Sequence, residues 1–401
     1  IEYIQYTDKT KIKRKLNKIY SIGTYLENDK SIINDNLILS LYIEEINNNI
    51  LYGISIINLS TGKINLFEKY NKDLNKILEE INKILIINLP KEIIISYIEN
   101  TEYITKIITI LSNNNENIHI NKNIEKDLLK ITYQNNFLTN IYKKYNFGVL
   151  NPIEYFDLER NQYSLISLII LLKFAYNHDN TIIENIENPI INIDTSKLNL
   201  HNNALYQLNI FSYNNNYKFN SLYDIINKTS TSLGKRLLKN NLSEPLIDID
   251  ELNIRYNLVE ELNKDNLYIK YEKELNNIID IEKYHKYIGI NKLQPFQLYR
   301  LLESYISIKN LLKISKNIFK NKFEYTKLNI FNEYYEEILK IFNFNNIETI
   351  NFSNTNQILN KNIFNENIIE DIDKIFNEIN GYNNYLTRLI DNLSNLINND
   401  K

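Results

Sequence analysis

The chain has 401 residues, of which 43% are hydrophobic and 24% are charged, and its 46 Lys and Arg against 49 Asp and Glu give a net charge of -3. This composition is typical of a globular protein with a sizeable core, and the charge excludes a strongly basic nucleic-acid wrapper. The lack of cysteine excludes disulfides, thiolate zinc sites and cysteine nucleophiles. No apolar run reaches the roughly 18 residues of a membrane span, and no signal-peptide pattern opens the chain. We therefore expect a soluble, non-secreted protein with no membrane partner.

Residues 1–20 form a basic N-terminal arm. A solvated linker is the favoured interpretation of this arm. Because one-sided charge can attract phosphates, its cations are also candidate DNA contacts. These residues are Lys11, Lys13, Arg14, Lys15 and Lys18.

Residues 21–146 combine strand and helix patterns. Short runs of β-branched and aromatic residues predict strands, and apolar residues at helical spacing predict helices. Strands first and strand–helix alternation afterwards favour a mixed sheet covered by helices. The predicted strands are 37–43, 51–59, 64–67 and 92–96, and the predicted helices are 74–86 and 101–111.

Residues 147–401 are mainly helical in pattern. The stretch 159–176 is apolar almost all round, which predicts a helix buried inside a bundle. A short strand is expected at 190–193, and helices follow from Leu222 onward. Asp248 is expected to cap a helix, and Pro295 to begin another. The last prediction is a long polar helix over 363–396, interrupted only by Gly381.

The sequence lacks the patterns of common catalytic sites. A phosphate-binding loop of the form G-x-x-x-x-G-K-[ST] is absent, as is the G-x-S-x-G turn of a serine nucleophile. The four histidines are scattered and lack partners at metal-ligand spacing. We therefore expect no catalytic, cofactor-binding or metal-binding residue in this chain.

The strongest local signal lies in residues 229–240. Hydroxyl residues, Thr231 among them, should cap the start of a helix. Gly234 should let a neighbouring backbone come close, and Leu237 and Leu238 should face inward. Gly234→Val is therefore expected to destabilise the helical domain over 147–401 while leaving the domain over 21–146 folded.

This segment resembles the core domain of the MutS mismatch-repair family. The family carries a T-x-x-G-x-R-x-L-x-x-W-L-x-x-P-L stretch and then an R-x-x-x-V-E helix, and Asn241 replaces the tryptophan here. The matching residues are Thr231, Gly234, Arg236, Leu238, Leu242, Pro245 and Leu246, followed by Arg255, Val259 and Glu260.

Further blocks follow the same family in chain order. Gly23 and Thr24 lie in a stretch similar to the T-P-G-T that opens the family's connector domain. Ser60, Thr61 and Gly62 end a stretch that resembles its Y-G-x-A-x-x-D-x-S-T-G strand and turn. Residues 280–283 are similar to its D-x-E-R, and residues 363–374 resemble the entry to its second lever helix.

The resemblance implies a ribonuclease H-like α/β connector over 21–146. It implies a helical core and lever domain over 147–401, ending before a clamp. The family's mismatch-reading, clamp and ATPase domains are expected outside this chain, which would be a piece of a longer protein. Three literal matches to the family's F-x-E motif lie in the helical half, where composition explains them. They begin at Phe331, Phe364 and Phe376.

The function that the resemblance implies is mechanical coupling of an ATPase to a DNA clamp. ATP and Mg²⁺ would be cofactors of the full-length protein only, and DNA would be bound through the other domains. A MutL-like partner would bind the connector, and the full-length protein would be a dimer, with this piece alone a monomer. Because Asn58 stands where ribonuclease H folds carry a catalytic Asp, nuclease activity is disfavoured. A free-standing scaffold and a weak DNA-binding module are the alternatives.

Overall fold

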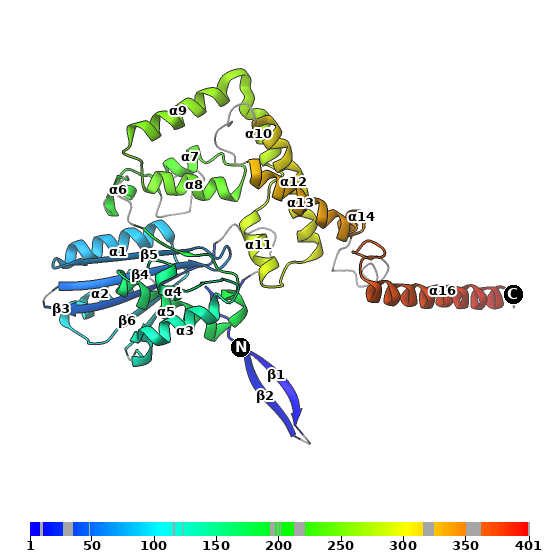
Figure 1. The fold of residues 1–401 in the computed structure, drawn as a ribbon, viewed down its shortest axis with the longest axis horizontal. Helices are drawn as coiled ribbons and strands as arrows, with labels where there is room; N and C mark the ends of the chain where they lie inside the picture. The colour runs from blue at the N-terminus through cyan, green and yellow to red at the C-terminus, as the bar shows by residue number, and fades with distance from the viewer. Residues whose placement is uncertain are drawn as a thin grey trace. The chain divides into compact units, whose positions relative to one another are not determined.

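The protein divides into two compact units. One comprises Ile1–Glu260 and Glu282–Lys292, and the other comprises Glu261–Ile281 and Leu293–Lys401 (Figure 1). The structure is a computed structural model. It describes residues 1–8, 11–26, 35–47, 49–114, 117–122, 124–192, 197–198, 200, 202–211, 221–315, 325–349 and 362–399.

The first unit is built on a six-stranded mixed sheet with the strand order β7-β6-β3-β4-β5-β8. Strands β3, β4 and β5 pair antiparallel, whereas the β3–β6, β6–β7 and β5–β8 pairs are parallel. The predicted α/β fold class is confirmed. The strands are β3 (Leu37–Ile46), β4 (Asn49–Asn58), β5 (Ile64–Asn71), β6 (Glu92–Tyr97), β7 (Ile118–Asn121) and β8 (Pro189–Ile191).

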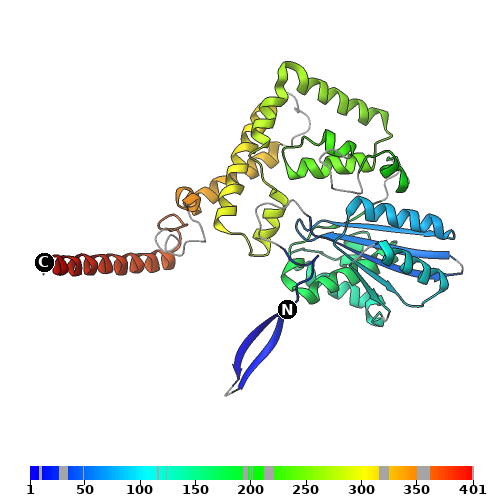
Figure 2. The same cartoon turned by 180° about the vertical axis from the view of Figure 1, so that it is seen from behind.

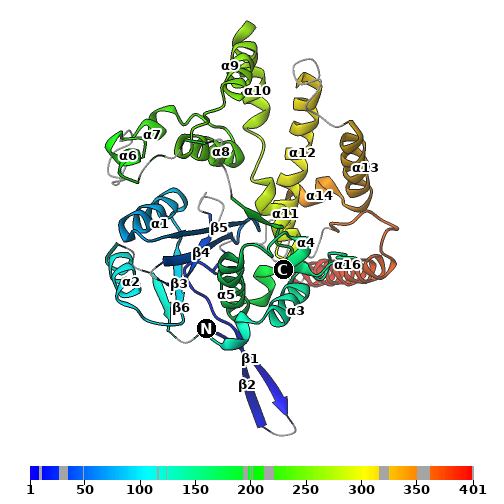
Figure 3. The same ribbon diagram turned by 60° about the vertical axis from the view of Figure 1, so that its left-hand side comes forward.

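Helices cover both faces of this sheet (Figure 3). Successive side chains of a strand point to opposite faces, so β3 contributes Leu39 and Leu41 to one core and Ile38 and Tyr42 to the other. The first core packs against α1 (Leu74–Asn88) and α2 (Glu102–Asn114), and the second against α3 (Ile131–Ile141), α4 (Pro152–Tyr155) and α5 (Gln162–His178).

Helix α5 lies on the sheet and not inside a helical bundle, contrary to the prediction. Its Ser167 hydroxyl is 2.9 Å from the Ser55 hydroxyl of β4 and donates to the Ser40 carbonyl of β3 at 2.8 Å. An apolar helix surface has the same sequence pattern whether a sheet or other helices cover it. Since β8 also joins the sheet, the sheet domain extends beyond residue 146, where the sequence placed its end.

The basic segment at the N-terminus is a two-stranded hairpin, which the sequence patterns did not predict. Strand β1 (Glu2–Asp8) pairs antiparallel with β2 (Lys11–Lys18) in a sheet of its own (Figures 1 and 2). The basic residues concealed the strand because lysine and arginine are weak strand formers. Their backbone hydrogen bonds with β1 nevertheless place them in a ladder.

Four helices follow the sheet domain in the chain, and the last of them, α9, ends in the second unit. Asp248 caps α9 as predicted, with its side chain accepting from the Asp250 and Glu251 backbone N–H groups at 2.8 and 3.1 Å. The other predicted boundaries differ by a few residues, as expected at helix ends. The helices are α6 (Asn202–Gln207), α7 (Leu222–Ile226), α8 (Ser232–Ser243) and α9 (Ile249–Asn263), and α11 (Ile281–Gly289) returns to the first unit.

The second unit is helical, as predicted. Helix α12 begins at Pro295 and packs against α10 and α14. Tyr305 is its buried centre, with the rings of Phe331 and Tyr335 edge-on to it. The helices are α10 (Leu267–Leu275), α12 (Pro295–Ser315), α13 (Tyr325–Ile341), α14 (Phe344–Thr349) and α16 (Glu370–Asn399).

The last helix starts later than the predicted residue 363. Phe364 forms a β-bridge with Phe342, and the Asn365 amide donates to the Lys340 carbonyl at 2.8 Å and so caps α13. Asn367 has a left-handed φ of 65°. These contacts hold the segment outside a helix until Glu370.

None of the helices in the described part of the chain has the length and apolar character needed to span a membrane.

Candidate functional site: an ionic junction of the signature segments

Glu282 of α11 joins two distant segments of the first unit. One carboxylate oxygen lies 2.5 Å from the Lys63 ammonium, which follows the turn after β4. The other lies 3.0 Å from the Arg236 guanidinium of α8, whose second nitrogen is 3.4 Å from the Asp35 carboxylate. Lys63 and Glu282 are 219 residues apart in sequence. We call Asp35, Lys63, Arg236 and Glu282 the junction.

The turn that carries Lys63 requires glycine. Gly62 has φ +88°, and a Cβ there would lie 3.3 Å from the Asn185 carbonyl oxygen. Its own carbonyl accepts from the Glu187 N–H at 2.9 Å. The left-handed backbone and the close chain together exclude a larger residue.

Asn58 shapes the same turn. Its side-chain oxygen accepts from the backbone N–H groups of Ser60 and Thr61 at 3.0 and 3.3 Å. The Ser60 hydroxyl accepts in turn from the Asn36 N–H at 3.3 Å. The amide oxygen of Asn58 is thereby used in an Asx turn. Neutral Asn58 has a structural role at the position where the resemblance would place a catalytic carboxylate.

Helix α8 presents Arg236 through a capped first turn. The Thr231 hydroxyl accepts from the Gly234 N–H at 3.0 Å, as predicted. The nearest atoms to a Cβ on Gly234 are side-chain atoms of Thr231 and Thr229, at 3.1 and 3.6 Å. The expected close approach of a neighbouring backbone is therefore wrong, and so is the inward orientation of Leu237, which is 60% exposed. Leu238 is half-buried.

Helix α11 is attached to residues 184–187 by two further contacts. The Lys286 ammonium donates to the Glu184 carbonyl, and the Asn185 amide donates to the Gly289 carbonyl. Lys286 is 3% exposed, and its burial lowers its pKa to about 7. Burial also lowers the pKa of His285. Helix α11 is thus bound at both ends to the sheet domain.

Lys286 should make stability depend on pH. Its amine has an ordinary pKa of 10.5, and burial lowers this to about 7, so the unfolded chain binds more protons between these values. Unfolding free energy should therefore rise with pH, by on the order of 1–2 kcal/mol between about pH 7 and pH 9. Urea denaturation at both pH values, with Lys286→Met as the comparison, measures this. Equal pH slopes in the two proteins would contradict it.

The remaining signature residues lie away from the junction. Gly23 and Thr24 form a buried turn, in which the Thr24 hydroxyl accepts from the Ser21 N–H at 3.0 Å. The Pro245 carbonyl accepts from the Leu198 N–H at 2.7 Å. Arg255 lies on an exposed face of α9.

The candidate DNA contacts separate into two groups. Lys18 lies 2.8 Å from the buried carboxylate of Asp179, and this ion pair gives it a structural role. Burial alone would raise the pKa of Asp179, but hydrogen bonds from Lys18 and Thr181 and the nearby Lys292 ammonium outweigh it and lower the pKa. Lys11, Lys13, Arg14 and Lys15 are placed in β2 by their backbone pairing alone.

Sequence reasoning found part of the junction. The family motif identifies Arg236, and the turn motif identifies Gly62, which precedes Lys63 of the junction. Lys63 and Asp35 were not, because nothing in their local sequence marks them. Glu282 lies in the D-x-E-K block, which was the one signal that could have identified it.

Comparisons with known proteins find MutS proteins similar to this chain over the segments described above. The family model described as MutS domain III matches residues 203–396. A mutS homologue of Acanthamoeba polyphaga mimivirus is 31% identical over 94% of this chain and 36% of its own length. DNA mismatch repair protein MutS of Caldanaerobacter subterraneus is 30% identical over 82% of the chain and 36% of its own length, and that of Clostridioides difficile is 29% identical over 83% and 32%.

The chain spans about a third of the length of these relatives, since it covers 36%, 36% and 32% of them. The aligned parts include both the sheet domain and the helical unit, because 94% of the chain is covered by the mimivirus relative. The family-model match begins at residue 203, well after the predicted domain boundary at 146 and after the last strand of the sheet, β8. The chain therefore belongs to the MutS family of DNA mismatch repair proteins, and residues 203–396 are its domain III.

Proposed function

We propose that the chain is the connector and core/lever part of a MutS-like protein and couples an ATPase mechanically to a DNA clamp. The observation that carries this proposal is the junction. Glu282 ties the sheet domain to α8 and is the first residue of the short segment, 282–292, that belongs to the first unit. Both chain ends of this segment continue into the second unit. A force applied to the helical unit would therefore reach the sheet domain through the covalent chain at Glu282.

The second support is α16, which is long and continuous, as a helix that transmits movement over a distance must be. Its 30 residues make a helix of about 45 Å. Apolar residues recur along it at alternating spacings of three and four, which is the pattern of a helix that pairs with another helix. Several of them are exposed, including Tyr382 at 70% and Leu386 at 54%. The series is Ile372, Ile375, Ile379, Tyr382, Leu386, Leu389 and Leu393.

ATP, Mg²⁺ and DNA enter this proposal through other parts of a full-length protein. The described residues contain no group of three or more His, Asp or Glu side chains that could hold a metal ion. A phosphate-binding loop is absent from the sequence. We propose in addition that a MutL-like partner binds the sheet domain and that dimerisation depends on the ATPase domains.

The test uses the complete protein encoded by the reading frame that contains this chain. Mismatch-stimulated and basal ATP hydrolysis are measured for wild type and for Glu282→Gln, which keeps the size of the side chain and removes its charge. We expect the stimulated-to-basal ratio to fall while basal hydrolysis is unchanged. The exposed Glu99→Gln is the matched control. An unchanged ratio in the Glu282 variant, or no mismatch dependence in wild type, would refute the coupling role.

The 401-residue chain alone should neither hydrolyse ATP nor distinguish a mismatched duplex from a matched one. Hydrolysis needs a loop that binds the phosphates and a hydroxyl that binds the metal, and mismatch reading needs a wedge that enters a kinked base step. A steady-state ATPase assay and fluorescence anisotropy on paired oligonucleotides at two salt concentrations measure both activities. Turnover above the buffer blank, or a mismatch preference that survives raised salt, would contradict this expectation.

A further inference from the structure

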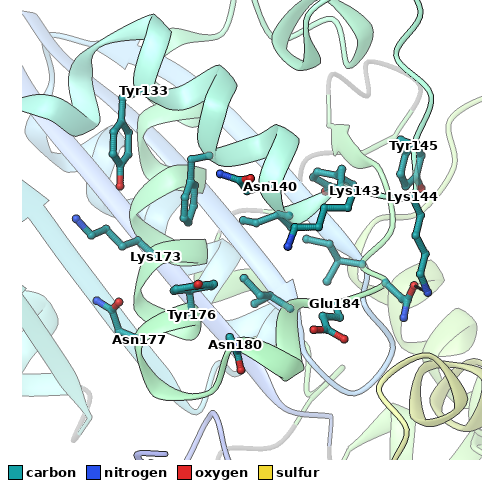
Figure 4. Close-up of a pocket in the computed structure, with 16 residues that line it drawn as sticks. Tyr133, Asn140, Lys143, Lys144, Tyr145, Lys173, Tyr176, Asn177, Asn180 and Glu184 are labelled. Atoms are coloured by element: carbon teal, nitrogen blue, oxygen red, sulfur yellow. Dashed lines mark hydrogen bonds between the residues drawn. The ribbon is translucent and has the colours of Figure 1, made fainter. Parts of the chain in front are cut away.

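The first unit contains a groove that the coupling role does not use. It lies between α3, the C-terminal end of α5, the 3-10 turn Asn180–Ile183 and residues 184–186 (Figure 4). Its volume is about 730 Å³. Pockets of roughly 300–1,000 Å³ are the usual size of specific binding sites. The groove is large enough for several side chains of a bound peptide.

The groove has an apolar floor. Ile183 and Ile186 are 2% and 3% exposed and lie at its base with Phe137 and Ile141. Tyr176 is 48% exposed at its rim. Burying one large apolar side chain on such a floor is worth about 1.5–3 kcal/mol. The floor therefore favours an occupant that carries an aliphatic or aromatic side chain.

The rim is positively charged. Three lysines and one carboxylate, Glu184, line the groove, although the whole chain has a net charge of -3. Lys173 is paired with Glu125 at 2.6 Å. Within the described part of the chain, Lys143 has no ion pair, and Lys144 donates only to the Asn185 amide oxygen, at 2.5 Å. In Figure 4, Lys173 and Asn177 lie at one end and Lys144 and Tyr145 at the other, with Lys143 between them.

We propose that this groove binds a short acidic segment of a partner protein, with one large apolar side chain on the floor and carboxylates at Lys143 and Lys144. A single-stranded nucleic acid fits less well. Base recognition without sequence preference needs open ring faces, whereas the rings of Tyr133 and Phe137 stack on each other at 6.0 Å and 12°. The floor beside them is largely isoleucine.

Two residues that line the groove also contact α11, the helix that carries Glu282 of the junction. They are Glu184 and Asn185. The Glu184 backbone carbonyl accepts from the Lys286 ammonium, and the Asn185 side-chain amide donates to the Gly289 carbonyl. A ligand that orders residues 184–186 should therefore also slow the opening of α11. Hydrogen exchange of residues 281–289 reports this effect, although those residues do not line the groove.

The experiment is a selection of random peptides displayed on phage against the folded chain. Counter-selection uses the double variant Lys143→Glu/Lys144→Glu. We expect enriched peptides to combine carboxylates with a large apolar residue. The affinity of the most enriched peptide is then measured by fluorescence anisotropy, with labelled oligothymidylate as the nucleic-acid probe.

The double variant should weaken binding of that peptide by at least roughly tenfold. Lys72→Glu/Lys76→Glu is the matched control, because it makes the same charge change beside and on α1, which covers the opposite face of the sheet. Asn140→Trp, which fills the groove from exposed α3, should also abolish binding. Enrichment of peptides without carboxylates, equal loss in the control, or tighter binding of oligothymidylate than of any peptide would overturn the proposal.

Discussion

Replacing Gly53 by alanine is expected to destabilise the sheet domain more than the same change at any other glycine of this chain. Gly53 lies in the middle of β4, and a Cβ there would be 2.1 Å from the carbonyl carbon of Tyr163 and 2.3 Å from the backbone nitrogen of Ser164. These are backbone atoms at the start of α5 and cannot move aside by changing rotamer. The variant should lose about 3–5 kcal/mol of unfolding free energy, measured by urea denaturation followed by circular dichroism.

Gly381→Ala is the control with the opposite sign. No atom lies within 4 Å of a Cβ at that position, and the residue is inside α16. Alanine is favoured over glycine in a helix by about 1 kcal/mol, so α16 should become more helical. If Gly53→Ala unfolded at the same urea concentration as wild type, the close packing of α5 on β4 would be wrong.

The second large effect is expected at the junction. Glu282→Lys would place a third cation beside Lys63 and Arg236, which are 44% and 22% exposed and now share the carboxylate. We expect a loss of about 1–3 kcal/mol, because partial exposure screens the repulsion. The loss should shrink as salt is added, since mobile ions screen exposed charges within about 10 Å at 0.1 M. Urea denaturation at two salt concentrations measures both effects.

Glu99→Lys provides the matched charge change, because Glu99 is exposed in the same unit and has no ion pair within the described residues. It should alter stability by less than about 0.5 kcal/mol. A double-mutant cycle of Lys63→Met and Glu282→Gln isolates the pair, with an expected coupling of about 0.5–1 kcal/mol. Zero coupling would show that the 2.5 Å contact contributes nothing in solution.

The sequence determined the elements whose signals are local. The β3–β4 hairpin, α1 and β6 follow from strand and helix periodicity, and the caps at Thr231 and Asp248 follow from hydroxyl and carboxylate chemistry at helix starts. Order along the chain also identified the MutS family, because its motifs are read from residue types at fixed spacing. None of this required knowledge of which segments touch.

The tertiary structure decided everything that depends on partners distant in sequence. The apolar pattern of α5 could not show whether a sheet or a bundle covers it. Nothing in the sequence around Lys18 indicated that it would pair with Asp179. The stretch 363–369 has a helical pattern, yet it is not helical. The side chain of Asn365 caps α13 instead, which holds this stretch in another conformation. Lys63, Arg236 and Glu282 meet only because the turn, α8 and α11 fold onto one another. Local sequence records the preferences of a backbone segment, whereas an ion pair between residues 219 apart exists only when the whole chain is packed.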